Sequence, residues 1–253
     1  MAENLKVNYY NNGDEMPLGY SNNSWPNLSH GAWTPYGDIN GIGAENREIY
    51  GLLYNWYAIN DERGICPEGL HIPSQSEMED LIIYLGGLDV EDNPDTDYNE
   101  TYYENSQISG GKAKETGTEH WESPNTGATN ESGFTGLPAG WRDPTMGYFY
   151  EINQRGLFWL STLGTSGNPA IDTPMKVELG YNHTEFWIDN GYWNAGYSVR
   201  CMAEVEEGCT HPNATNYDET ANVDDGSCTY PDYGEYSLSF DGINNYVDLQ
   251  NTN

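Results

Sequence analysis

Residues 50–87 constrain the fold more than any other stretch, because two helical patterns there flank a cysteine-bearing turn. In the first pattern apolar residues recur at helical spacing, so one face of the predicted helix must pack against the rest of the chain. The turn, residues 66–73, contains two prolines and a glycine, which favour a rigid turn over a third helix. The apolar positions of the first pattern are Ile49, Leu52, Leu53 and Trp56.

The second pattern carries a fuller helix signature. Ser74 and Glu77 fit the S-x-x-E capping box, in which each side chain bonds the backbone amide of the other residue. Gly86 then supplies the left-handed residue that ends a helix. Two helices are therefore expected to frame a loop-rich body. The predicted buried stripe of the second helix consists of Met78, Leu81, Ile82 and Leu85.

The charge of the chain excludes several classes of partner. Its 40 acidic residues against 9 basic ones give a net charge of -31, which repels nucleic acid and anionic membranes. Such acidity is common in secreted proteins that live in salt or hold divalent cations. No run of about 18 apolar residues occurs, so no membrane span is predicted. The 253 residues suffice for one good core with a small appendage.

Four cysteines indicate an oxidising compartment, outside the cell or on its surface. Three pairings are formally possible. We favour Cys66 with Cys201 and Cys209 with Cys228, because each bond then closes within one sequence unit. The loop between the last two is short, acidic and poor in large apolar residues, so a disulfide worth about 3 kcal/mol would supply what its core lacks. Four metal-ligating thiolates are the alternative, but no C-x-x-C spacing is present.

Short strands are predicted over much of the remaining chain. Residues 5–10 alternate and residues 11–14 form a turn, and aromatic strands between residues 110 and 201 are bounded by glycine and asparagine. They suggest an antiparallel sheet with large loops, which together with two helices gives an α+β fold. Residues 88–109 form an acidic loop, interpreted as solvated surface in preference to a cation site. The later predicted strands are residues 148–152, 156–162, 175–179, 184–188 and 196–201.

Five motifs support a family resemblance. They resemble, in order along the chain, the Fibrobacter succinogenes major paralogous domain, over residues 1 to about 203. The resemblance implies a fold similar to the C-type-lectin-like and formylglycine-generating-enzyme group. It also implies secreted or surface proteins that are large, multidomain and adhesive. The motifs are residues 1–7 (MAENLKV), 50–58 (YGLLYNWYA), 66–73 (CPEGLHIP), 125–134 (NTGATNESGF) and 196–201 (GYSVRC).

The chain departs from the family pattern in three places. The family has Trp before the Met-Ala-Glu-Asn motif, so the natural chain is expected to begin before Met1. Where the family shows Trp-Ser-Ser-Thr, this chain has Trp159-Leu160-Ser161-Thr162, so any role of the first serine is lost. The acidic loop of residues 88–109 is also longer than usual.

Two further segments follow the predicted body, residues 1–203. Residues 204–231 resemble the Cys-bounded repeats that link domains in secreted bacterial surface proteins. Residues 232–253 resemble the opening β-hairpin of a laminin-G-like or concanavalin-like jelly roll, which must pair with its own body or with a neighbouring copy. The disulfide-stapled linker offers oxygen ligands suited to calcium, with a plain polar turn region as the alternative. These predicted calcium ligands are Asn216, Asp218, Asn222, Asp224 and Asp225.

The predicted ligand-binding segment is residues 181–194, together with Trp159. Flat aromatic rings beside amide and carboxylate groups can stack on sugar faces, bond hydroxyls or contact proteins. The alternative is that Trp187 and Tyr197 fill the core and the rest is loop. The candidate residues are Trp159, Tyr181, Asn182, His183, Glu185, Trp187, Asp189, Asn190, Tyr192, Trp193 and Asn194.

No catalytic motif is present. The 5 histidines lie in unrelated contexts, without an H-E-x-x-H motif or a nucleophile elbow, and a formylglycine-generating activity would need free thiols. We therefore predict a non-enzymatic extracellular module for adhesion or assembly at a cell surface, with a glycan or protein ligand. The alternatives are a filament subunit joined to neighbouring copies of itself by strand addition, a carbohydrate-binding lectin-like module, and an enzyme of the formylglycine-generating type.

Overall fold

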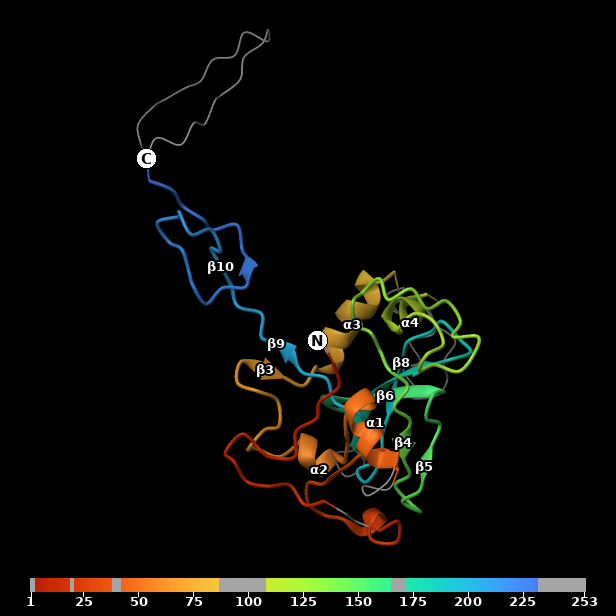
Figure 1. Ribbon diagram of the computed structural model, residues 1–253. Coiled ribbons are helices and arrows are strands. Elements are labelled where there is room, and N and C mark those ends of the chain that lie inside the picture. Colours follow the sequence, from red (N-terminus) through yellow and green to blue (C-terminus); the bar gives the residue numbers. More distant parts are fainter. Residues whose placement is uncertain (1–2, 19–20, 38–41, 87–107, 165–171, 232–253) are drawn as a thin grey trace. The chain divides into compact units, whose positions relative to one another are not determined.

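Helices and short strands are mixed up to residue 113, after which the described chain forms strands without a further helix, so the predicted α+β class is confirmed (Figure 1). The computed structural model describes residues 3–18, 21–37, 42–86, 108–164 and 172–231, in two compact units, Met1–Glu204 and Val205–Asn253. The elements are η1 (Trp25–Asn27), β1 (Trp33–Thr34), α1 (Ile42–Tyr50), β2 (Leu53–Tyr54), α2 (Trp56–Ile59), β3 (Leu70–His71), α3 (Gln75–Tyr84), α4 (Ser109–Ala113), β4 (Trp141–Arg142), β5 (Phe149–Tyr150), β6 (Arg155–Gly164), β7 (Thr173–Gly180), β8 (Trp187–Asn190), β9 (Met202–Ala203), β10 (Glu207–Gly208) and β11 (Val223–Asp224).

A three-stranded antiparallel sheet in the order β6-β7-β8 organises the first unit. Because successive strand residues point to opposite faces, the sheet joins two apolar clusters. Phe158 and Val177 on one face pack in a cluster with Ile82 of α3. Trp159 on the other face packs in a second cluster with Trp56 of α2. The sheet is therefore the centre of the core.

The predicted strands agree with the observed strands in part. Those at residues 148–152, 156–162, 175–179 and 184–188 overlap β5, β6, β7 and β8. Residues 196–201 form no strand of the sheet, because they pair for one residue at a time with different elements, Tyr197 with Tyr54 and Ser198 with Phe158. Residues 5–10 form no named strand either, and only Tyr9 bridges to Glu15 across the predicted turn.

The prediction of one helix through residues 49–56 is wrong. Helix α1 ends at Tyr50, β2 follows in an antiparallel pair with β1, and Asn55 then caps the short helix α2. Gly51 makes the break, with a φ of +76° in the left-handed region. A Cβ there would lie 2.8 Å from the Cβ of Asn4, so the close approach of the N-terminal segment requires glycine. Ile49, placed on the buried face by the pattern, is 41% exposed.

The second predicted helix is confirmed as α3. Its capping box is complete: the Glu77 amide donates to Ser74 Oγ at 3.3 Å, and the Ser74 amide donates to Glu77 Oε2 at 2.8 Å. Gly86 has a φ of +94° just beyond the helix, as expected of a C-terminal glycine. Leu81 is partly buried, and the fully buried members of the stripe are Met78, Ile82 and Leu85.

Both predicted disulfides, Cys66–Cys201 and Cys209–Cys228, are present. All four cysteines are therefore oxidised, which leaves no thiolate to ligate a metal. Residues 66–73 form more than the predicted turn. Strand β3 lies within them and pairs antiparallel with β9, beside the disulfide Cys66–Cys201. This pairing fastens the end of the first unit to the segment before α3.

The second unit has little apolar burial in its described part. Strands β10 and β11 pair in parallel, and of residues 205–231 only Gly208 and Cys209 are buried. The predicted hairpin of residues 232–253 lies outside the described residues, as does the acidic loop except Ile108 and Ser109.

Candidate functional site

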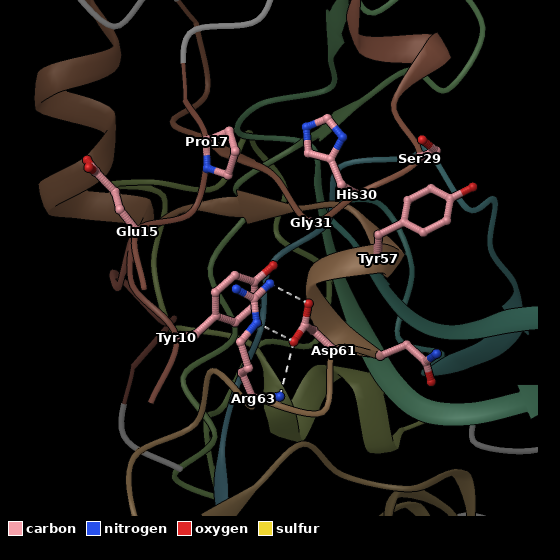
Figure 2. A pocket seen from close by; sticks show the side chains of 10 residues that line it. Tyr10, Glu15, Pro17, Ser29, His30, Gly31, Tyr57, Asp61 and Arg63 are labelled. Atoms are coloured by element: carbon pink, nitrogen blue, oxygen red, sulfur yellow. Dashed lines mark hydrogen bonds and ion pairs between the residues drawn. The ribbon is translucent and has the colours of Figure 1, made fainter. Parts of the chain in front are cut away.

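A pocket of about 490 Å³ opens in the first unit (Figure 2). Three stretches contribute to it: the N-terminal segment, the loop before β1, and α2 with the turn that follows. Its size falls in the range of small-ligand pockets, roughly 300–1,000 Å³. The lining residues are Tyr10, Glu15, Pro17, Ser29, His30, Gly31, Tyr57, Asn60, Asp61 and Arg63.

A fixed arginine forms the floor of this pocket. The Arg63 guanidinium lies 3.8 Å from the centre of the Tyr10 ring (Figure 2). Its Nε and Nη2 donate to Asp61 at 2.8 Å each, and its Nη1 donates to Asp14 at 2.9 Å. The two carboxylates raise the pKa of Arg63, and Arg63 in turn holds the pKa of Asp61 below its usual value. Burial, followed by the charge of Asp61, raises the pKa of Tyr10 to about 12.

Gly31 permits this arrangement. A Cβ at residue 31 would overlap the hydroxyl of Tyr10 and would meet the backbone of Ala58 at 3.0 Å. Only a glycine therefore lets the Tyr10 ring, and the guanidinium against it, lie beside α2.

The other side of the pocket is polar and aromatic. Ser29, Tyr57 and Asn60 have side-chain polar groups without a hydrogen bond to the described residues, so they remain available to a ligand. The Tyr57 ring lies 5.9 Å from the ring of Trp193. The pocket is thus joined to the end of the predicted ligand-binding segment.

Within that predicted set, Trp159 is misplaced. Its side chain is 1% exposed, and its Nε1 donates to the carbonyl oxygen of Tyr54 at 2.7 Å. It packs against Trp56 and Tyr197 at ring distances of 5.4 and 4.5 Å. Its position inside β6 turns it to the core, so Trp159 cannot meet a ligand at the surface.

The remaining aromatic residues of the segment divide between two neighbourhoods. At the start of β8 the Trp187 ring stacks on His183 with centroids 4.4 Å apart, and His183 Nδ1 lies 3.2 Å from a carboxylate oxygen of Glu185. Burial lowers the pKa of His183, although the charge of Glu185 acts in the opposite direction. Beyond the strand, Trp193 contacts Tyr57. The alternative that Trp187 fills the core is wrong, because it is 40% exposed, whereas Tyr197 is 2% exposed and does fill the core.

The polar residues of the segment have different roles. Asp189 and Asn190 are exposed on β8, and Asn182 is exposed before it. Tyr181 is partly buried against the cluster under α3. Asn194 is structural, since its side-chain amide donates to the carbonyl oxygen of Pro26 and its backbone carbonyl oxygen accepts from Trp25 Nε1 at 2.6 Å.

Charged side chains lie on the sheet next to Trp187. Lys176 and Glu178 of β7 are buried and 3.1 Å apart, and Lys176 also reaches Asp189 at 3.3 Å. Arg155 of β6 pairs with Glu178 and with Glu151, the latter at 3.2 Å. Lys176 and Glu178 therefore each have an opposite charge beside them.

The predicted calcium ligands bond to their own segment. Asn216 Oδ1 accepts from the Thr229 amide at 2.7 Å, and Asp218, Asn222, Asp224 and Asp225 each accept a nearby amide. The described residues contain no group of three His, Cys, Asp or Glu side chains arranged to hold a metal ion. Calcium binding stays a prediction.

Sequence reasoning did not find the pocket residues. The contacts that shape the pocket join residues up to 49 positions apart in the sequence, as between Asp14 and Arg63. No short sequence motif predicts such contacts. One signal was available: Arg63 is one of only 9 basic residues, and it follows two acidic residues.

Comparison with known proteins gives one long match and two short ones. The family model of the Fibrobacter succinogenes major domain matches residues 1–202 of the sequence. A ribulose bisphosphate carboxylase/oxygenase activase of Spinacia oleracea is 49% identical over 43 residues, 17% of this chain and 9% of that protein. Activase 1 of Larrea tridentata is 73% identical over 45 residues, 17% of this chain and 10% of that protein.

The chain thus spans about a tenth of the curated relatives that it matches. No solved structure matches it. Among the described residues no helix has the length and apolarity that a membrane span requires. The long match covers most of the chain and carries the disulfide Cys66–Cys201 within it. The chain therefore belongs to the Fibrobacter succinogenes major domain family, a family of surface or secreted type.

Proposed function

We propose that this protein is a non-catalytic extracellular recognition module that adheres to a glycan chain through an aromatic surface in two neighbourhoods of one segment, defined as Trp187 in the first and Tyr192 with Trp193 in the second. The distribution of tryptophans carries the proposal. Of the 8 tryptophans, five are at most 2% exposed, whereas Trp187 and Trp193 are 40% and 37% exposed. Tyr192 between them is 65% exposed. Exposed aromatic rings gathered in one segment are typical of binding sites.

The chemistry beside the aromatic surface suits a sugar polymer. An aromatic ring can stack on the C–H face of a sugar, and neighbouring polar groups can bond the hydroxyls at its edge. Asp189 offers a carboxylate that is 56% exposed, and the Asn182 amide is exposed before β8. The net charge of -31 repels acidic polymers, which favours a neutral glycan.

Two observations support a non-catalytic role. All four cysteines are held in disulfides, so thiol-dependent chemistry of the formylglycine-generating type lacks its nucleophile. The charged side chains beside Trp187 are paired with one another, which is a structural use of charge. Assembly into filaments through residues 232–253 stays a prediction, because those residues lie outside the described part.

A glycan array followed by variants tests the proposal. We expect Trp187→Ala and Tyr192→Ala each to weaken binding to the array's best neutral glycan about fivefold to tenfold, since each removes a stacking ring. Tyr84→Ala is the matched control, because Tyr84 is 83% exposed on α3 and outside the aromatic surface. Equal binding by all three variants would reject the aromatic surface as the site.

A further inference from the structure

We infer that the pocket in Figure 2 is a second binding site, which takes a single neutral sugar residue and discriminates against acidic sugars. It shares its ligand class with the proposed function but depends on other side chains. The inference rests on three features: a polar side with unused hydrogen-bonding groups, a rigid floor, and a negative charge.

The polar side provides both donors and acceptors. The hydroxyls of Ser29 and Tyr57 can each donate and accept, and the Asn60 amide can do both with separate atoms. None of these groups has a side-chain partner among the described residues. The hydroxyls of a sugar ring need this mixture, because each of them is itself a donor and an acceptor. The Tyr57 ring, set against Trp193, adds a flat surface beside them.

The floor is already ordered before any ligand arrives. Three hydrogen bonds to Asp14 and Asp61 and the contact with Tyr10 hold the Arg63 side chain in one conformation. A guanidinium has five N–H donors, so donors remain to bond a hydroxyl oxygen. Groups that are fixed in advance lose little conformational entropy when a ligand binds.

The charge of the pocket selects among sugars. Asp14, Asp61 and Glu15 outnumber the single arginine, so the pocket has a net negative charge within an already acidic protein. A sugar carboxylate would meet this charge without an unpaired cation to bind it. A neutral ring avoids the repulsion, because its hydroxyls require only hydrogen bonds.

Protein-observed NMR titration with single sugars tests this inference. The probes are glucose, galactose and mannose, with glucuronate as the acidic comparison. We expect at least one neutral sugar to bind and to shift the resonances of His30 and of the Asn60 side-chain amide. Glucuronate should bind at least fivefold more weakly. The double variant Tyr57→Phe, Asn60→Ala should weaken neutral-sugar binding about tenfold, since it removes two hydrogen-bonding groups.

The control variant makes the same two types of substitution at residues outside the pocket. Asn23→Ala with Tyr148→Phe changes one exposed asparagine and one exposed tyrosine outside the pocket, and it should bind like the wild type. Sugar binding that survives the pocket variant but is lost in Trp187→Ala would overturn the inference and assign the sugar to the aromatic surface. Failure of all neutral sugars, or equal binding of glucuronate, would also overturn it. A positive glycan array in the same preparation would then leave the proposed function standing.

Discussion

At the scale of single residues, Arg200 shows why distant sequence motifs occur together. Its guanidinium donates to the carbonyl oxygens of Phe134 and Thr135 and, at 2.8 Å, to Oδ1 of Asn4. The Asn4 amide group donates in turn to the carbonyl oxygen of Tyr50 at 2.8 Å. Four of the five motifs therefore meet at one buried cation, whose pKa burial lowers to about 10.

Substitution of Arg200 tests this convergence. We expect Arg200→Lys to lower the free energy of unfolding by about 2 kcal/mol, because a lysine cannot reach all three acceptors and leaves a buried carbonyl unpaired. Chemical denaturation gives the value. Arg47→Lys is the control, since Arg47 is half-buried and makes one backbone bond at 3.2 Å. An equal loss of unfolding free energy in the two variants would mean that the Arg200 contacts contribute no more to stability than the single Arg47 contact.

The pocket floor makes a prediction about pH. Asp61 has a folded pKa below its unfolded value, mainly because Arg63 donates to it, so its contribution to stability is present above the unfolded pKa and is lost as the pH falls through the folded pKa. We expect Arg63→Gln to raise the Asp61 pKa, as measured by carboxyl ¹³C NMR titration. Lys112→Gln is the control, because Lys112 pairs with Glu131. An unchanged Asp61 pKa in Arg63→Gln would refute this electrostatic account.

At the scale of elements, sequence motifs predicted those helices and strands whose ends depend on interactions between neighbouring residues. Helix α3 was predictable because its capping box and its terminal glycine act within the helix itself. The first helical pattern was misread because its apolar spacing does not show that Gly51 interrupts the helix. Gly51 turns the chain where Asn4 packs against it, and Asn4 is distant in the sequence. Trp159 was misplaced for a similar reason, since aromatic character does not say that both faces of β6 are covered by distant parts of the chain.

The candidate sites show the same limit. Residues 181–194 are contiguous, so composition alone pointed to the segment that contains the aromatic surface. The pocket is assembled from three separate stretches, and its geometry depends on Gly31 admitting the Tyr10 hydroxyl. A single sequence contains no signal that joins such positions.

The capping box of α3 gives a prediction at this scale. We expect Ser74→Ala to lower the free energy of unfolding by about 1 kcal/mol, since the Glu77 amide then loses its acceptor. Ser76→Ala is the matched control, because Ser76 is exposed in the first turn and alanine favours helix. Thermal unfolding of both variants measures the difference. A loss no larger than that of the control would show that the cap contributes nothing.

At the scale of the whole molecule, the two units depend on different interactions. Two apolar clusters and the sheet β6-β7-β8 stabilise the first unit, and Cys66–Cys201 adds to an existing core. Residues 205–231 bury only Gly208 and Cys209. Their backbone bonds, such as that from the Asp218 amide to the carbonyl oxygen of Cys209, therefore lie near solvent.

The disulfide Cys209–Cys228 must consequently supply most of the stability of residues 205–231. The bond Cys209–Cys228 closes a loop with a sequence separation of 19, for which chain entropy predicts about 3 kcal/mol. This stabilisation exceeds what the small apolar surface buried by residues 205–231 can provide. We expect Cys209→Ser with Cys228→Ser to abolish amide hydrogen-exchange protection across residues 205–231. In the control, Cys66→Ser with Cys201→Ser, the same amides keep their protection because their own disulfide is intact. If residues 205–231 stay protected without Cys209–Cys228, their hydrogen bonds or a bound cation must hold them, and the disulfide is not their main source of stability.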